Sequence, residues 1–143
     1  MTRINIVEVS QLTNAHCLAE YKEITRPFNK VIKRIEKYGE AYALKDVTIS
    51  KMYILGTGQE SFFFSKLFWL YERYYALHIE LFGRGYNLDV DQFLQIRNDL
   101  YNNLSNTIYW KDYHPTPEEI YLNMARLCKR SNVESVLNEL TEE

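Results

Sequence analysis

One stretch of the chain, residues 62–82, is dominated by aromatic and aliphatic side chains and contains neither glycine nor proline. Apolar residues cover much of its circumference when it is drawn as a helix, which is typical of a helix that is buried on most sides. Gly83 and Gly85 follow it and favour termination of the helix. We therefore predict that residues 62–82 form a long central helix against which the rest of the chain packs.

The segment before it has the apolar spacing of an amphipathic helix that runs to about residue 37. Ser10 or Asn14 can cap its start, because either side chain can accept a hydrogen bond from a free amide. Pro27 lies inside the segment and cannot donate the helical hydrogen bond, so we expect a kink there. Gly39 then ends the helix.

Two further helices are predicted after the central one. Residues 90–104 have helical apolar spacing. Residues 116–130 begin with a capping threonine, a proline and two acidic residues, which is a typical helix start. We expect Ile120, Met124 and Leu127 to point inward from this helix.

Residues 133–140 are predicted to form a short last helix, and residues 39–61 a long loop. No stretch has the alternating pattern of a strand. The predicted fold class is all-α, with a few long helices packed side by side and joined by long loops. At 143 residues we expect one compact domain over residues 1–143.

Composition excludes several classes of function. No apolar run approaches the ~18 residues of a membrane span, and no secretion signal is visible. Cys17 and Cys128 are isolated, which indicates reduced, structural thiols. His16, His78 and His114 are far apart and have no metal-ligand spacing, so we expect neither a metal nor a cofactor.

The most reactive candidate groups lie at the start of the chain. Thr2 is small, so we expect removal of the initiator methionine and a free α-amine. The reference pKa of an α-amine is ~7.7–8.0, against ~10.4 for lysine, so more of it is the neutral nucleophile at cellular pH. Glu23 lies on the same side of the predicted first helix as His16 and Glu20. An ordinary N-terminus without a chemical role is the alternative.

Positive charge is concentrated near these groups although the net charge is -2. Residues 1–84 carry 12 Lys and Arg and 9 Asp and Glu, whereas residues 85–143 carry 5 and 10. A row of cations on the first helix, hereafter the cationic stripe, could follow a phosphate backbone or simply be a solvated face. Its members are Lys22, Arg26, Lys30, Lys33 and Lys37.

These residues carry a resemblance to a known family. The pattern Met1-Thr2-Arg3-Ile4-Asn5, His16, Ala19-Glu20-Tyr21-Lys22-Glu23 and Arg26 resembles that of the pyrimidine-dimer DNA glycosylases. Weaker support comes from the blocks at residues 54–58, 62–67, 84–87 and 112–127. The resemblance covers roughly residues 1–130.

The resemblance implies an enzyme that cleaves the glycosidic bond of a UV-damaged pyrimidine in double-stranded DNA and then nicks the strand by β-elimination. It implies that the Thr2 amine attacks the sugar carbon to form an imine, and that Glu23 stabilises the cationic sugar and assists proton transfer. His16 would line the site. The side chains expected to contact DNA are Arg3, Lys22, Arg26, Lys30, Lys33, Arg126 and Arg130.

Some positions depart from the family pattern. Lys22 stands where an arginine is expected, which removes a bidentate phosphate contact. Pro27 follows Arg26 instead of preceding it, and Arg130 replaces a lysine. Residues 138–143 are acidic, where the family pattern is basic and aromatic.

Two alternative functions stay open. One is a lyase that acts on abasic sites or ring-opened purines with little activity on dimers. The other is a helical DNA-binding module that has lost the chemistry, which the presence of Thr2 and Glu23 disfavours. For the enzyme we expect a monomer in the cytoplasm of a bacterium or of a phage-infected host.

Overall fold

The structure, a computed structural model, describes residues 3–130 and contains no strand in that part of the chain. This confirms the all-α class, and the helix predicted at 133–140 lies outside the described residues. Short 3-10 turns occupy Val9–Gln11, Glu40–Tyr42 and Phe63–Ser65. The α-helices are α1 (Asn14–Glu23), α2 (Thr25–Tyr38), α3 (Gln59–Phe62), α4 (Leu67–Gly83), α5 (Val90–Leu104) and α6 (Pro117–Arg130).

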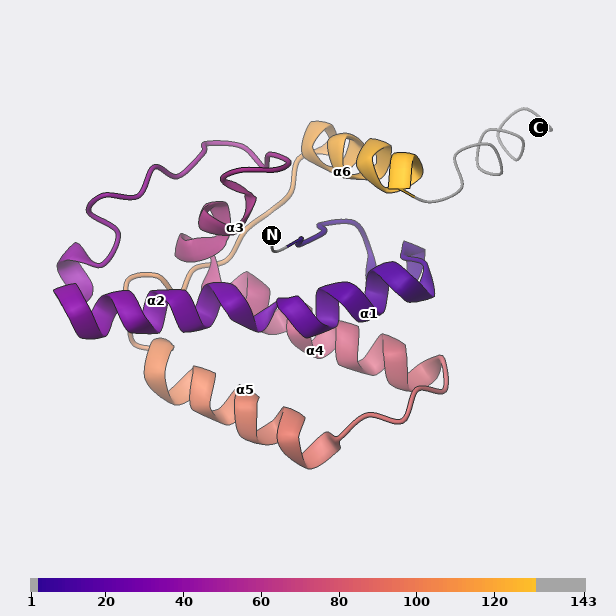
Figure 1. Cartoon of the computed structure of the whole chain (residues 1–143), viewed down its shortest axis with the longest axis horizontal. Helices are drawn as coiled ribbons and strands as arrows, with labels where there is room; N and C mark the ends of the chain where they lie inside the picture. The colour runs from indigo at the N-terminus through magenta and orange to yellow at the C-terminus, as the bar shows by residue number, and fades with distance from the viewer. Residues whose placement is uncertain (1–2, 131–143) are drawn as a thin grey trace.

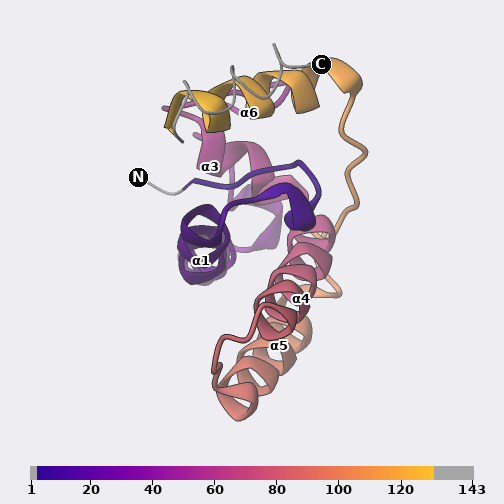
Figure 2. The same cartoon turned by 90° about the vertical axis from the view of Figure 1, so that its right-hand side faces the viewer.

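Helix α4 lies at the centre of the fold, behind α1 and beside α5 (Figures 1 and 2). Residues 3–8, the N-terminal segment, have α1 on one side and α6 on the other. Leu67, Leu70, Leu77 and Leu81 are fully buried along one of its faces. This confirms residues 62–82 as the core region, but the helix is interrupted. Lys66 leaves the helical conformation, so the buried residues 62–64 lie outside α4, at the end of α3 and in the 3-10 turn that follows it.

The connection after α5 stabilises the start of α4. It runs along the outside of the molecule from α5 to α6 (Figure 2). The carbonyls of Tyr109 and Lys111 accept hydrogen bonds from the amides of Leu67 and Trp69. These amides lie in the first turn of α4, where no helical partner exists.

The predicted first helix is divided in two at Ile24. The cap prediction was wrong, because the Thr13 hydroxyl accepts the hydrogen bond from the His16 amide in place of Ser10 or Asn14. The break lies at Ile24 and not at Pro27 as predicted. Pro27 falls in the first turn of α2, where an amide has no helical partner in any case, so the new helix accommodates the proline. Glu23 is consequently the last residue of α1, at the break.

Helix α6 begins as predicted, but it presents a different face to the interior. Ile120 and Met124 are 36% and 37% exposed, so their predicted inward orientation was wrong, whereas Leu127 is buried. The inward positions are Glu119, Asn123 and Leu127, each one turn apart. Two of them are polar because they face backbone amides of other segments, which need hydrogen-bond acceptors.

Replacing Glu119 with Gln is expected to destabilise the protein at neutral pH and to have a diminishing effect in acid. Burial acts to raise the pKa of the Glu119 carboxyl, but the donating amides of Tyr53 and Thr116 hold that pKa below its usual value. Such a carboxylate stabilises the fold above its unfolded pKa of ~4.3, and the contribution is lost as the pH falls through the lower, folded value. Urea unfolding of both proteins from pH 3 to pH 7 measures this, and a pH-independent difference contradicts it.

Candidate active site at the N-terminal segment

Residues 3–8 form an irregular segment that passes between α1 and α6 (Figures 1 and 2). Its residues Ile4 to Val7 are all buried. A segment without regular structure carries amides and carbonyls that have no partners within it, so buried side chains must satisfy them. Its hydrogen bonds therefore define what holds the start of the chain in place.

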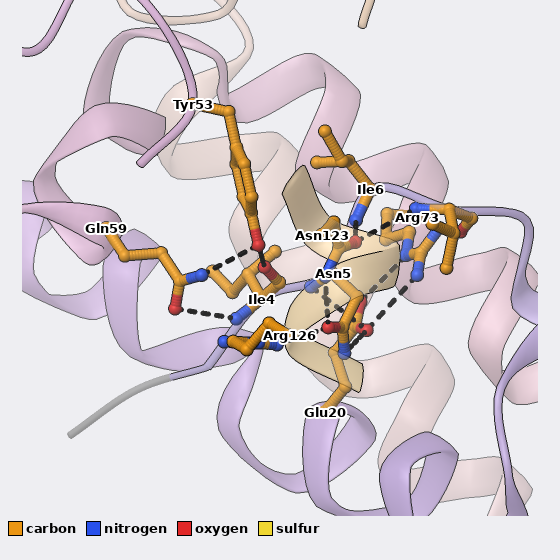
Figure 3. A network of polar contacts seen from close by, with 10 residues as sticks. Ile4, Asn5, Ile6, Glu20, Tyr53, Gln59, Arg73, Asn123 and Arg126 are labelled. Atoms are coloured by element: carbon orange, nitrogen blue, oxygen red, sulfur yellow. Dashed lines mark hydrogen bonds and ion pairs between the residues drawn. The ribbon is translucent and has the colours of Figure 1, made fainter. Parts of the chain in front are cut away.

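One group of contacts fixes Ile4. The Tyr53 hydroxyl donates to the Ile4 carbonyl over 2.7 Å, and the Ile4 amide donates to Gln59 Oε1 over 3.3 Å. Gln59 Nε2 in turn donates to the Tyr53 hydroxyl over 2.7 Å (Figure 3). Burial raises the pKa of Tyr53 to about 12, so the phenol is protonated and donates at neutral pH.

A second group fixes Asn5 against α1. Glu20 Oε1 accepts from the Asn5 amide over 3.2 Å and from Asn5 Nδ2 over 2.9 Å. Arg73 of α4 donates to both Glu20 oxygens, over 2.7 Å from Nε and 3.1 Å from Nη2, and also to the Val7 carbonyl. Neither side chain of this ion pair is more than 7% exposed. The paired charges thus lie inside the protein, directly beneath the N-terminal segment.

A third group comes from α6. Asn123 Oδ1 accepts from the amides of Ile6 and Val7, and Asn123 Nδ2 donates to Asn5 Oδ1. Arg126 also donates to Asn5 Oδ1. These contacts join α6 to the N-terminal segment (Figure 3).

Glu23 lies where the segment leaves this network. Its Oε2 accepts a hydrogen bond from the Arg3 amide over 2.9 Å, and its Oε1 lies 3.8 Å from a guanidinium nitrogen of Arg26. The Glu23 side chain is 25% exposed, so it is accessible from solvent. Thr2 lies outside the described residues. A carboxylate is nevertheless held against the peptide nitrogen that follows Thr2 in the sequence.

The other predicted site residues are distributed along α1, α2 and α6. His16 is half-buried on α1, about 10.5 Å along the helix from Glu23. All five residues of the cationic stripe are exposed, and Lys30 forms an ion pair with Glu60. Arg126 is half-buried beside Asn5, whereas the side chain of Arg130 is outside the described residues.

Part of the cationic stripe borders an open cavity of about 650 Å³. Lys30, Lys33 and Arg34 of α2 form one wall, and residues 46–48, 57–58, 60–61 and 64 contribute others. Arg34 is bound to Asp46 and to the Ala43 carbonyl, which ties the long loop to α2. The cationic face is therefore hollowed, with polar groups on both sides.

Sequence reasoning missed the residues that hold the segment. Arg73 offered a signal, because a lone arginine in the middle of an apolar, aromatic helix needs a buried partner. Asn123 offered a weaker one, as a polar residue between apolar positions. The residues missed were Asn5, Tyr53, Gln59, Arg73 and Asn123.

Among residues 3–130, no group of three or more His, Cys, Asp and Glu side chains is arranged to hold a metal ion. Within the same part of the chain, no helix is both long and apolar enough to cross a membrane. A family model described as pyrimidine dimer DNA glycosylase matches residues 1–94. The match contains the N-terminal segment, Glu20, Glu23 and Arg73, and it ends within α5, before α6 begins.

Proposed function

Because the chain belongs to the pyrimidine dimer DNA glycosylase family, we propose that it excises UV-induced pyrimidine dimers from duplex DNA and then nicks the strand through an imine on its N-terminal α-amine. The observation that carries this proposal is the 2.9 Å hydrogen bond between the Arg3 amide and Glu23. In a chain that begins at Thr2, the α-amine is three covalent bonds from that amide nitrogen. A nucleophile and an acidic group are thereby brought within reach of one sugar.

The proposed reaction has two stages. The neutral amine attacks the anomeric sugar carbon, the nitrogen–carbon bond forms, and the glycosidic bond breaks with its electron pair leaving on the base, which takes up a proton. The sugar opens to an imine, which makes the neighbouring sugar proton acidic. Loss of that proton expels the adjacent phosphate and nicks the strand. Glu23 stabilises the cationic sugar and assists the proton transfers.

The cationic stripe supports the choice of DNA as the partner. Its exposed side chains, together with Arg3, would neutralise phosphates on the strand that carries the lesion. Arg126 and Arg130 are proposed to contact phosphates from the side of α6. A dimer already weakens base stacking, which lowers the cost of the distortion that admits the sugar to the site.

Borohydride trapping tests this function. Reduction of the imine should link the protein covalently to duplex DNA that contains a pyrimidine dimer, and peptide mapping should locate the link at Thr2. Trapping on abasic-site DNA alone would favour the lyase alternative, and no trapping on either DNA would favour a binding module. The intact mass of the sample must first show that Met1 has been removed.

A matched control is the same protein with its α-amine acetylated. Acetylation leaves the side chains and the cationic stripe unchanged but removes the nucleophile. It is expected to abolish trapping while duplex binding is retained. Undiminished trapping by the acetylated protein would assign the imine to a lysine and contradict the proposal.

A further inference from the structure

The side-chain amide group of Asn5 forms hydrogen bonds with two helices. Its Nδ2 donates to Glu20 of α1, and its Oδ1 accepts from Asn123 of α6 over 2.9 Å (Figure 3). Both partners are almost completely buried. The residues on either side of Asn5 are isoleucines, which can make neither contact. The slot between Glu20 and Asn123 therefore accepts one residue of the N-terminal segment and rejects its neighbours.

Asn123 also holds the backbone that follows. Its Oδ1 accepts from the Ile6 amide over 2.6 Å and from the Val7 amide over 3.2 Å. A shift of the segment by one residue would place an isoleucine in the slot, where it can neither donate to Glu20 Oε1 nor accept from the buried Asn123 Nδ2. One side chain of α6 thus contacts both the Asn5 side chain and the two backbone amides that follow it.

We propose that Asn123 is a positioning residue that fixes the register of the N-terminal segment and so places the α-amine beside Glu23. The inference rests on the proposed function, in which that amine is the nucleophile. A slip by one residue displaces the terminus by ~3.3 Å, and a displacement of ~1 Å can lower a catalysed rate about 100-fold. Helix α6, which lies outside the family match, is consequently a structural part of the active site.

The test compares Asn123→Ala with Leu127→Ala, a buried apolar position one turn further along α6. Single-turnover borohydride trapping on dimer DNA is measured at a temperature where circular dichroism shows both variants folded. Asn123→Ala is expected to lower the trapping rate about 100-fold and to change the dissociation constant for duplex DNA less than threefold. Leu127→Ala is expected to change both quantities less than threefold, even if it lowers the melting temperature as much.

The experiment distinguishes a failure of the inference about Asn123 from a failure of the proposed function. Equal trapping rates in the two variants, with trapping intact in the unmodified protein, would overturn the role of Asn123 alone. Absence of trapping in the unmodified protein would overturn the proposed function itself. Asn123→Asp adds a graded test, because it keeps an acceptor for Ile6 and Val7 but removes the donor to Asn5. An intermediate rate is expected.

An N-terminal extension tests the register in a protein whose interior is unchanged. Adding one glycine before Thr2 moves the amine outward, and a fixed register prevents the segment from sliding back. Trapping is expected to fall at least about 100-fold. A rate near that of the unmodified protein would show that the segment can slip by one residue. This result would contradict the proposed fixed register even if Asn123→Ala fails to fold.

Discussion

Replacement of Glu23 with Gln will lower strand cleavage at least about 100-fold and leave duplex binding nearly unchanged. Glutamine has the same shape, and its carbonyl oxygen can still accept the hydrogen bond from the Arg3 amide. The variant therefore keeps the N-terminal segment in place but loses the negative charge and the proton acceptor. The measurement is single-turnover cleavage of dimer DNA, with a gel-shift titration for binding.

Glu36→Gln is the matched control for this variant. Glu36 is an exposed residue of α2, so its replacement changes the net charge equally without touching the N-terminal segment. It is expected to leave cleavage unchanged and, like Glu23→Gln, to strengthen DNA binding only slightly, because each variant loses one negative charge. Cleavage by Glu23→Gln at the rate of Glu36→Gln would remove Glu23 from the mechanism.

Replacement of Arg73 with Met will destabilise the protein by about 3–5 kcal/mol, the largest effect on folding that we expect of a single change. Methionine fills a similar volume but leaves the Glu20 carboxylate without its cation in an environment from which water is excluded. It also removes the donor to the Val7 carbonyl. The free energy of unfolding, from urea titration at neutral pH, measures the loss.

Three further variants test whether the loss of stability in Arg73→Met comes from the unpaired buried charge. Arg73→Lys keeps the charge but not the fork geometry, so a smaller loss is expected. The double variant Arg73→Met with Glu20→Gln should recover part of the stability, because the unpaired charge is gone. Lys30→Ala breaks the surface pair with Glu60 and should cost less than about 1 kcal/mol. If Arg73→Met lost no more stability than Lys30→Ala, the buried pair would not matter for stability.

The buried pair and the candidate site depend on the same atoms. Glu20 binds both Arg73 and Asn5, and Asn5 is three residues from the proposed nucleophile. A loss of the pair therefore loosens the N-terminal segment as well as the fold. Replacing Arg73 is therefore expected to lower both stability and activity, whereas replacing Asn123 is expected to affect the reaction more than the stability.

Local sequence patterns predicted most of the helices. Residues 90–104 form a helix with the predicted bounds, and Pro117 begins another, because a cap and apolar spacing act over one or two turns of chain. The same patterns misjudged the start of α4 at residue 67. Residues 62–64 are strongly apolar in any conformation, so their spacing does not distinguish one long helix from a short helix and turn that precede α4.

The candidate site also has a part that local sequence patterns predicted and a part that they did not. Glu23 and the cationic stripe lie within the first 37 residues, and their relation to one another follows from helical spacing and from the family resemblance. In the structure the Glu23 carboxylate accepts a hydrogen bond from the Arg3 amide, the peptide nitrogen that follows Thr2 in the sequence. The roles proposed for Glu23, His16 and the DNA-contacting side chains stay predictions, as do those of Thr2 and Arg130, whose side chains lie outside the described residues.

The residues alone were enough to predict the helical class, the core region and the reactive groups at the start of the chain. The contacts that hold this start in place became visible only in the folded protein. Asn5 and Asn123 are 118 positions apart, and Tyr53 and Glu119 are 66 apart. Such pairs form because a buried amide or carbonyl must find a partner in whichever segment packs against it. Local periodicity does not encode which segment that is.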